Sequence, residues 1–402
     1  MNTKTYIKRN SYINQVKPFM GKNLIKVFTG QRRVGKSYLC YQLIDEINAT
    51  DTQANIIYIN KELYQFDHIR DYNDLYNYFN EHYAAGKSNY FIIDEIQDIS
   101  GFEKCLRSLL AEGRADLYIT GSNSEMLSGD LASYLSGRYV EIKVFSLSLS
   151  EFLTFHKLDS NQANFMKYLQ YGGLPGLVSI GLNENLVYEY LRNIYATILL
   201  KDVVKRYKVR NINFLESLVK YVADNTGCII SAKKISDFLK SQKVNISPNI
   251  VMDYLGYLAA SFFIFKVDRS DLEGKKVFEI GQKYYFEDLG IRHSLIEYRQ
   301  NDINKILENV VHLHLKIAGF DVKIGWQQGR EIDFVATRNN QRIYIQVAYL
   351  IPDDKVHERE FGNLLKINDQ YPKYVLSMDA LTGSQYKGIM HQSVMDFILN
   401  LE

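Results

Sequence analysis

"FTGQRRVGKSYLC", residues 28–40, decides how the amino-terminal part of this chain folds. Two glycines, Gly30 and Gly35, bracket four residues, and Lys36 follows directly. An apolar run at residues 23–28 precedes the loop, and apolar residues at helical spacing follow it. The pattern therefore predicts a strand, a glycine-bracketed loop and a helix, in that order.

A loop of this kind suits a phosphate group. Glycines let backbone N–H groups curl around phosphate oxygens, and the following helix N-terminus adds a partial positive charge. Lys36 can then reach the β and γ oxygens of a nucleotide, while the Ser37 hydroxyl can ligate Mg²⁺. A chance match is expected in on the order of one in a hundred chains of this length. The residues predicted to bind the nucleotide are Gly30, Gln31, Arg32, Arg33, Val34, Gly35, Lys36 and Ser37.

A second motif agrees with the first. NYFIIDEIQDI, residues 89–99, is an apolar strand that ends in Asp94 and Glu95. The first carboxylate is expected to hold Mg²⁺, and the second to orient and deprotonate an attacking water, which favours hydrolysis. The N-K-x segments at residues 60–63 and 304–307 lack the aspartate that reads guanine, so ATP is favoured over GTP.

Two further segments supply candidate catalytic residues. A predicted strand, ADLYITGSNS at residues 115–124, ends in polar side chains, of which Ser122 and Asn123 are expected to sense the γ-phosphate. Arg138 follows a predicted helix and is a candidate for stabilising transition-state charge, in its own chain or in a neighbouring subunit. Ordinary turn chemistry is the alternative for all three residues.

These segments resemble those of bacterial and archaeal AAA-type ATP-binding proteins. The resemblance spans nearly the whole chain and rests on GQRRVGKS, FIIDEIQ, ITGSNS, LSGRY, LSLSEFL, YGGLPG, KDVVKRYKVRN and EIDFVATRNNQRIYIQVAYL. It implies an α/β chain with an AAA-type parallel-sheet ATPase domain that uses ATP and Mg²⁺. It also implies a C-terminal domain that resembles the PD-(D/E)XK restriction-endonuclease fold.

Four parts are expected along the chain: an ATPase domain at residues 1–150, a helical lid at 151–210, a winged helix at 211–290 and the nuclease-like domain at 291–402. Three predicted helices and a hairpin suggest the winged helix. Its third helix contains no Lys or Arg, so packing between domains is favoured over reading of bases. Seven basic residues nearby keep non-specific DNA binding open: Lys233, Lys234, Lys240, Lys243, Arg269, Lys275 and Lys276.

The nuclease-like segment lacks part of its chemistry. Enzymes of that fold hold a divalent metal with an aspartate and a second carboxylate, and a lysine two residues later positions the water. Asp333 fills the first place, but Gln346 and Ala348 occupy the other two. A neutral amide is a poor ligand for a hard cation, so we expect a degenerate site without cleavage. Glu308 and Glu331 are candidates for a displaced carboxylate, and no lysine nearby replaces the missing one.

Composition sets limits on partners and compartment. Lys and Arg number 48 against 46 Asp and Glu, so the net charge of +2 gives no overall field that attracts nucleic acid. Three widely spaced cysteines suit a reducing cytoplasm, and no secretory signal or membrane span is expected. His312 and His314 stand two apart on a predicted helix, so they face different ways and do not suit a shared metal.

The function expected from these features is an Mg²⁺-dependent ATPase that acts as a switch or motor on nucleic acid or a protein client. An ATP-gated protein scaffold with negligible turnover and an ATP-gated metal-dependent nuclease are the two alternatives. Possible partners are further copies of the chain in a homo-oligomer, a protein client, and DNA bound without sequence specificity.

Overall fold

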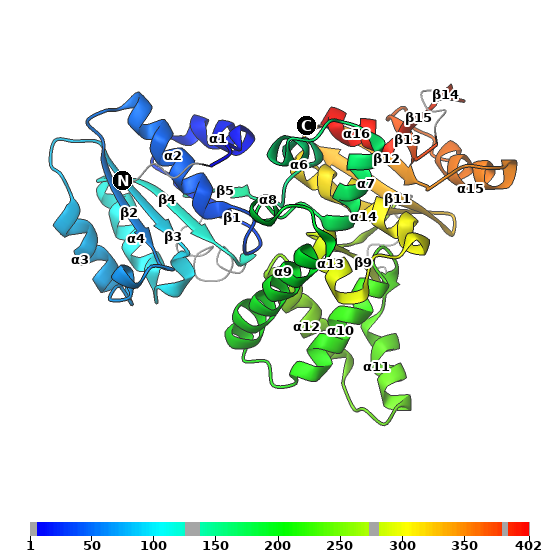
Figure 1. Ribbon diagram of the computed structural model, residues 1–402, viewed down its shortest axis with the longest axis horizontal. Coiled ribbons are helices and arrows are strands. Elements are labelled where there is room, and N and C mark those ends of the chain that lie inside the picture. The colour runs from blue at the N-terminus through cyan, green and yellow to red at the C-terminus, as the bar shows by residue number, and fades with distance from the viewer. Residues whose placement is uncertain (1–5, 125–136, 273–280, 380–384, 402) are drawn as a thin grey trace. The chain divides into compact units, whose positions relative to one another are not determined.

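The computed structural model describes residues 6–124, 137–272, 281–379 and 385–401 (Figure 1). The chain divides into two compact units. Unit 1 comprises Met1–Phe145 and Ala260–Phe262, and unit 2 comprises Ser146–Ala259 and Phe263–Glu402. Lys275 and Lys276, expected on the wing of the winged helix, lie outside the described residues.

Unit 1 contains a five-stranded sheet in the order β2-β3-β4-β1-β5, and all its pairs are parallel. The strands are β1 (Ile25–Thr29), β2 (Asn55–Asn60), β3 (Asn89–Asp94), β4 (Asp116–Gly121) and β5 (Tyr139–Lys143). All five residues of β1 are buried, as expected for an inner strand covered on both faces. The carboxyl ends of all five strands therefore meet at one edge of the sheet.

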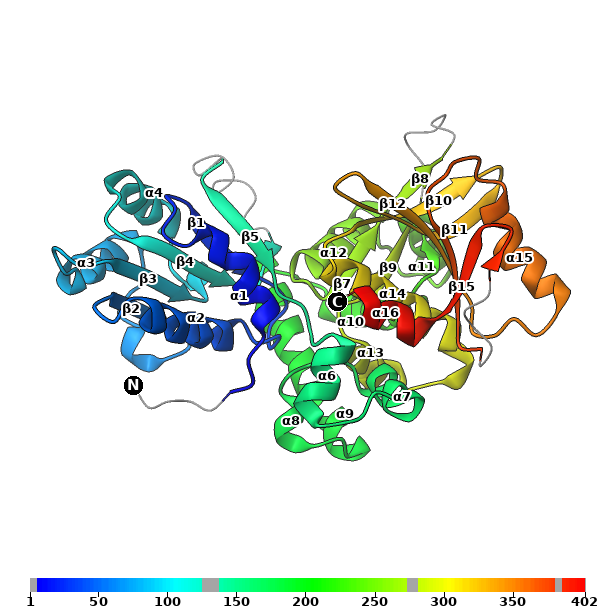
Figure 2. The same cartoon turned by 90° about the horizontal axis from the view of Figure 1, so that it is seen from above.

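Helices cover both faces of this sheet (Figure 2). They are α1 (Asn10–Val16), α2 (Lys36–Thr50), α3 (Tyr72–His82) and α4 (Phe102–Glu112), with short 3₁₀ turns at η1 (Lys17–Phe19), η2 (Tyr64–Phe66) and η3 (Ile96–Asp98). From β1 the chain crosses to β2 at the edge of the sheet, and it then returns through β3 to β4. Because each crossover is right-handed, α2 lies on one face of the sheet, and α3 and α4 lie on the other. Helix α1 packs against α2, and α3 packs against α4.

Unit 2 begins with helices and a small sheet. The first group is α6 (Leu149–His156), α7 (Gln162–Tyr171), α8 (Leu177–Ile180), α9 (Glu184–Thr197) and a π-helical segment, η5 (Ile198–Lys205). Then follow α10 (Ile212–Asp224), β6 (Ile229–Ile230), α11 (Ala232–Ser241), α12 (Pro248–Ala260), β7 (Ile264–Val267) and β9 (Gln282–Phe286). The three strands pair antiparallel in the order β6-β9-β7, so β9 lies in the middle. As the sequence predicts, Ser231 caps α11, accepting the N–H of Lys234.

The rest of unit 2 contains a seven-stranded mixed sheet in the order β14-β15-β13-β12-β11-β10-β8. Its strands are β8 (Arg269–Asp271), β10 (Asp321–Gln327), β11 (Arg330–Arg338), β12 (Gln341–Val347), β13 (Lys373–Ser377), β14 (Gln385–Tyr386) and β15 (Ile389–Ser393). The helical elements are α13 (Leu289–Ile296), η6 (Gln300–Asp302), α14 (Ile303–Ile317), α15 (Asp354–Leu365) and α16 (Val394–Leu401). Strands β10, β11 and β12 are antiparallel, whereas β12 and β13 are parallel.

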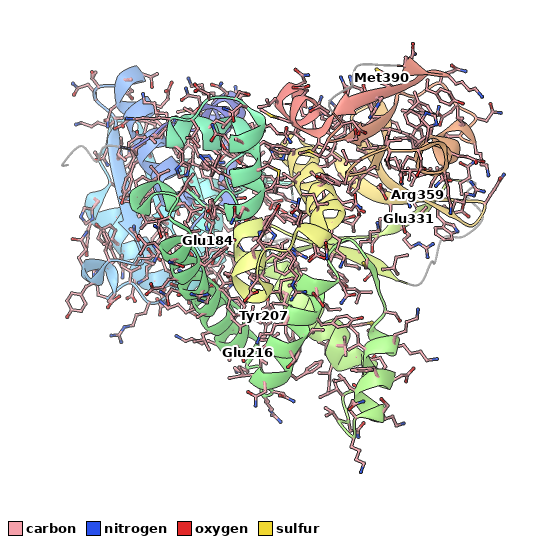
Figure 3. All side chains as sticks on the ribbon, turned by 45° about the vertical axis from the view of Figure 1, so that its right-hand side comes forward. Glu184, Tyr207, Glu216, Glu331, Arg359 and Met390 are labelled. Atoms are coloured by element: carbon pink, nitrogen blue, oxygen red, sulfur yellow. The ribbon has the colours of Figure 1, made fainter. Side chains whose placement is uncertain are left out.

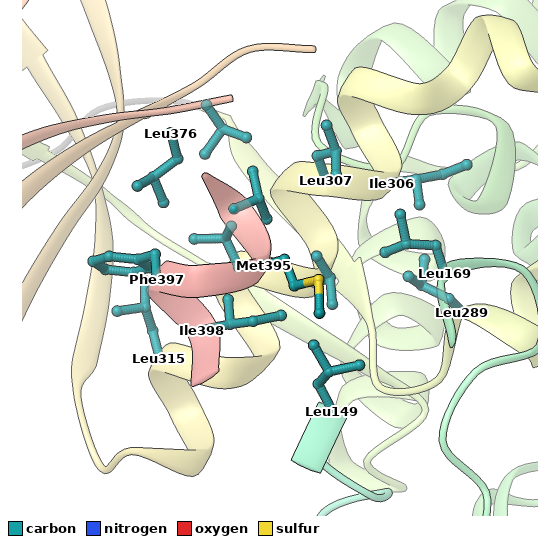
Figure 4. Packing of buried hydrophobic residues seen from close by; sticks show 14 of the residues in the cluster. Leu149, Leu169, Leu289, Ile306, Leu307, Leu315, Leu376, Met395, Phe397 and Ile398 are labelled. Carbon is teal, nitrogen blue, oxygen red and sulfur yellow. The ribbon is translucent and has the colours of Figure 1, made fainter. Parts of the chain in front are cut away.

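A hydrophobic core in unit 2 joins helices from distant parts of the chain (Figure 4). It joins Leu149 of α6, Leu169 of α7, Leu289 of α13, Leu307 of α14 and Ile398 of α16, all of which are buried. Residues from the parts expected at 151–210, 211–290 and 291–402 all contribute to this core, and a separate core lies around Phe361 and Leu364 of α15. Within the described ranges, no helix is long and apolar enough to cross a membrane.

Two buried histidines contribute to this core. His314 uses both ring nitrogens: Nδ1 lies 2.8 Å from the Val310 carbonyl, and Nε2 accepts the Leu149 N–H at 3.1 Å. The ring must be neutral to accept at Nε2 while donating at Nδ1. Burial lowers the pKa of His314 to about 4. His312 instead stacks on Tyr285, with ring centroids 4.7 Å apart, so the two histidines serve packing on different sides of α14.

Unit 2 should lose stability in mild acid. A histidine with a depressed folded-state pKa contributes stability that is complete above pH 6.5 and is lost as the pH falls toward about 4. For His314 this loss amounts to roughly 3 kcal/mol. We expect His314→Gln to be less stable than wild type at pH 7.5 but to lose less stability between pH 7.5 and pH 5 in urea unfolding. The exposed His82→Gln is the matched control, and equal pH slopes for His314→Gln and wild type would contradict the assignment.

Candidate nucleotide-binding site

The loop between β1 and α2 depends on glycine at two places. A Cβ on Gly30 would lie 2.1 Å from the Val144 carbonyl oxygen, so only glycine lets the loop pass this close to the chain after β5. Gly35 has a φ of 100° and stands directly before the first residue of α2. The loop therefore curls at the N-terminus of a fifteen-residue helix, where the helix dipole favours an anion.

Lys36 lies at the centre of this loop with only 3% of its side chain exposed. Its ammonium donates to the carbonyls of Gly30 and Gln31, both at 3.0 Å. The Glu95 carboxylate lies 3.6 Å away and supplies the counter-charge. The cation is thus held inside the loop by two carbonyls and one carboxylate.

Asp94 ends β3 and is completely buried. Burial and the Glu95 charge raise its pKa, while hydrogen bonds from Ser37 and Thr120 partly offset this rise. The Thr120 hydroxyl donates to Oδ1 of Asp94 at 2.5 Å and also accepts the Glu95 N–H at 2.9 Å. Parallel pairing of β3 with β4 sets this contact, because Ile93 lies opposite Ile119.

Glu95 is a buried carboxylate in an unusual backbone conformation. Its φ of 58° falls in the left-handed region, which costs energy for a residue with a side chain. Burial raises its pKa, but the charges of Lys36 and Arg32 outweigh that effect, so the pKa lies below its usual range. Hydrogen bonds from Gln97 and Ser122 lower it further. The carboxylate is therefore ionised at neutral pH and held by neighbours on two other segments.

Gln31 supports the interpretation of this loop as a ligand site. The residue is 1% exposed, yet neither the oxygen nor the nitrogen of its side-chain amide has a hydrogen-bond partner among the described residues. Such an arrangement costs energy unless a ligand satisfies the amide. Together with the glycine turn and the Lys36 ammonium, it fits a loop that contacts polar oxygens.

The structure brings most of the predicted residues together, but not Arg138. Ser122 and Asn123 follow β4 at the same edge and are buried. Arg138, by contrast, precedes β5, and its carbonyl accepts the N–H of Ile25 at the start of β1. Roughly 16 Å of strand therefore separates it from the loop that follows β1. Its exposed position suits no role in the site of its own chain.

The two arginines in the loop between β1 and α2 have different surroundings. Arg32 pairs with Glu62 at 3.1 Å, and its charge reaches Glu95. Arg33 is exposed and has a φ of 73°. Val34 is buried, and its carbonyl accepts a hydrogen bond from Arg9.

Two residues of this site were not predicted. Arg9 donates to the carbonyls of Val34 and Phe145, both at 2.9 Å, and so fixes the loop to the end of β5. Its partners are 25 and 136 positions away, so no local pattern could reveal it. Gln97 donates to the Glu95 carboxylate. The sequence shows that Gln97 stands two residues after Glu95. It does not show the left-handed backbone at Glu95, which turns the Gln97 side chain back toward the carboxylate.

The residues predicted for the nuclease-like site also converge, in unit 2. Glu308 lies on α14 and Asp333 on β11, and both approach the Lys283 ammonium, at 3.2 and 3.9 Å. The side-chain oxygen of Gln346 accepts the Asp333 N–H at 3.4 Å. Sequence reasoning found no lysine nearby, and the structure supplies Lys283 from β9, 50 positions before Asp333.

Comparison with known proteins gives the family context. Residues 22–153 match an AAA domain, and residues 162–302 match a domain of unknown function, DUF8612. An uncharacterized protein of Haemophilus influenzae is 34% identical over 403 residues, covering 99% of this chain and 100% of the relative. The uncharacterized protein MJ1544 of Methanocaldococcus jannaschii is 30% identical over 342 residues, covering 81% of this chain and 75% of the relative.

Solved structures show only a distant likeness. The Orc1 protein of Aeropyrum pernix, solved in complex with DNA, is 11% identical with a TM-score of 0.34, covering 72% of this chain and 92% of that chain. A TM-score this low supports no inference about function.

Lys36 provides the direct test of nucleotide binding. We expect Lys36→Ala to weaken Mg·ATP binding by roughly 100-fold or more, because each charge-assisted hydrogen bond contributes about 1.5–3 kcal/mol. Equilibrium titration with a fluorescent ATP analogue measures the change, with circular dichroism as a check on folding. Lys143→Ala, which removes an exposed lysine on β5, is the control. Equal affinity in Lys36→Ala and wild type would refute the site.

Proposed function

The chain belongs to the family of the Haemophilus influenzae and Methanocaldococcus jannaschii proteins and carries an AAA domain, and on that basis we propose that it binds and hydrolyses ATP to drive a conformational switch. One observation carries the proposal. Lys36, Asp94 and Glu95 meet at the carboxyl edge of a parallel sheet, within a single network of hydrogen bonds and ion pairs.

The residues present fit a magnesium ion. The Ser37 hydroxyl and the Asp94 carboxylate are hydrogen-bonded neighbours, and both offer the oxygen ligands that Mg²⁺ prefers. When bound, Mg²⁺ neutralises charge on the β and γ phosphate oxygens. Thr120 holds Asp94 in position through its hydroxyl.

Binding of the triphosphate involves an exchange of partners. The Lys36 ammonium is paired with Glu95, and to clamp phosphate oxygens it must direct its donors toward them. The exchange releases the Glu95 carboxylate from its closest cation. Nucleotide binding and preparation of the base are therefore one event.

Glu95 then acts on the attacking water. Its carboxylate accepts a proton as the water oxygen forms a bond to the γ-phosphorus, and the bond to the bridging oxygen breaks to release ADP. Gln97 and Ser122 orient the carboxylate through hydrogen bonds. The buried loop excludes competing solvent, since Gln31 and Asn123 are almost completely covered.

We further propose that unit 2 serves a protein client rather than reading DNA bases. The order of α10, β6, α11, α12, β7 and β9 supports a winged helix. Helix α12, which would be its recognition helix, contains no basic residue and exposes Met252 at 54%. Phe238 on α11 is 65% exposed. Tight, sequence-dependent DNA binding in fluorescence anisotropy would overturn this assignment.

A role for Arg138 requires a second subunit, because the residue lies at the far edge of its own sheet. We propose that it reaches the nucleotide of a neighbouring copy. A monomer in light scattering with ATP present would eliminate that role.

A variant of Glu95 distinguishes an ATPase from a scaffold that only binds ATP. We expect Glu95→Gln to bind ATP at least as tightly as wild type, since a negative charge beside the phosphates is removed. Turnover should fall by roughly 100-fold or more, because the amide cannot accept the proton. Phosphate release and ATP titration measure the two effects, with the exposed Glu81→Gln as control. If the mutant and wild type hydrolyse ATP equally slowly, the scaffold alternative gains.

The C-terminal sheet is proposed to be a nuclease-like fold without cleavage. The order α14–β10–β11–β12–α15–β13, with Asp333 on β11, supports the PD-(D/E)XK comparison. We expect purified protein to leave plasmid and linear DNA intact in Mg²⁺ or Mn²⁺, because Gln346 replaces a carboxylate. Cleavage that copurifies with the protein and disappears in Asp333→Ala would establish the nuclease alternative instead.

A further inference from the structure

A buried lysine lies among three carboxylates in unit 2. The Lys283 ammonium lies 2.6 Å from Oε1 of Glu331, 3.2 Å from Oε2 of Glu308 and 3.9 Å from Oδ1 of Asp333. Only 3% of the lysine side chain is exposed. Figure 3 labels Glu331, which lies near the start of β11. One cation therefore contacts all three acids.

The cation and the acids come from different layers of the fold. Lys283 belongs to β9, the middle strand of the three-stranded sheet, where it pairs with Ile229 on one side and Val267 on the other. Glu308 lies on α14, and the other two acids lie on β11. Because β9 is held on both edges, the backbone of the lysine cannot shift to follow its partners.

Further donors fix the carboxylates around the ammonium. The Tyr285 hydroxyl donates to Oε2 of Glu308 at 3.0 Å, and the Val347 N–H donates to Oδ2 of Asp333 at 2.8 Å. Burial raises the pKa of both acids, although Lys283 counters part of that rise. Without a cation, these acids would bear an uncompensated charge in a buried site.

We propose that this cluster is a cation site whose permanent occupant is the Lys283 ammonium; that a divalent metal would otherwise take this place rests on the nuclease-like fold proposed above for the C-terminal sheet. The chain thereby supplies its own cation and fastens β9 to α14 and β11. The inference does not depend on ATP binding or hydrolysis, since every residue lies in unit 2.

The alternative is a displaced catalytic lysine that positions a water beside a metal. That role requires the ammonium to stand to one side of the metal ligands. Here the ammonium has contacts with every acid of the set, so it takes the position between them. With Lys283 in place, no group of three or more His, Cys, Asp or Glu among the described residues is arranged to hold a metal ion. A response to Mn²⁺ is therefore expected only in variants that lack the ammonium.

Removal of the lysine tests the proposal. Thermal unfolding without nucleotide should give wild type the same melting temperature in EDTA and in Mn²⁺. Lys283→Ala should melt at least about 6 °C lower in EDTA, because it leaves buried acids unpaired. Mn²⁺ at about 100 times its dissociation constant should raise the melting temperature of this variant by about 5 °C or more. Lys266→Ala, at an exposed site on β7, is the matched control.

Second variants keep the test decisive if Lys283→Ala does not fold. Lys283→Met combined with Glu308→Gln removes the cation together with one acid, and should be more stable than Lys283→Met alone. Where Lys283→Ala does fold, adding Asp333→Asn to it should abolish its response to Mn²⁺. The proposal fails if Mn²⁺ stabilises wild type through Asp333. It also fails if Lys283→Ala melts like wild type, or if the destabilised variant ignores Mn²⁺.

Discussion

The parallel register of β1, β3 and β4 is the constraint on which the nucleotide-binding site depends. It places the ends of three strands at one edge, so that Thr120 can donate to Asp94 and accept the Glu95 N–H. A shift of β4 by one residue would turn Thr120 to the other face and break both contacts. The loop after β1 passes close to the backbone of Val144 at Gly30, and this path brings Lys36 next to Glu95.

Each unit contains a buried lysine whose charge is balanced by neighbouring oxygen atoms. In unit 1, Lys36 has two carbonyls and one carboxylate, and the proposed nucleotide would compete for its donors. In unit 2, Lys283 is surrounded by three carboxylates, so no single competing anion displaces them. On these two proposals, the number of counter-charges distinguishes the exchangeable contact of Lys36 from the permanent contacts of Lys283.

Much of unit 1 could be predicted from sequence, because its signals are local. The spacing of Gly30, Gly35 and Lys36 and the acids at the end of β3 lie within short segments whose chemistry is specific. Arg9 and Lys283 could not be predicted in this way, since each joins segments far apart in the chain. The core shared by α6, α7, α13, α14 and α16 could not be predicted for the same reason: helical and strand periodicity shows which face is buried, not which neighbour covers it.

A cation supplied by the chain has different consequences from a bound metal. A metal can be removed by chelation and can activate a water, whereas an ammonium on β9 does neither. On the proposal that Lys283 is the permanent cation, the carboxylates of α14 and β11 serve the packing of unit 2 rather than hydrolysis. Lys283 reaches them from β9, so its ion pairs join the three-stranded sheet to α14 and β11 within unit 2.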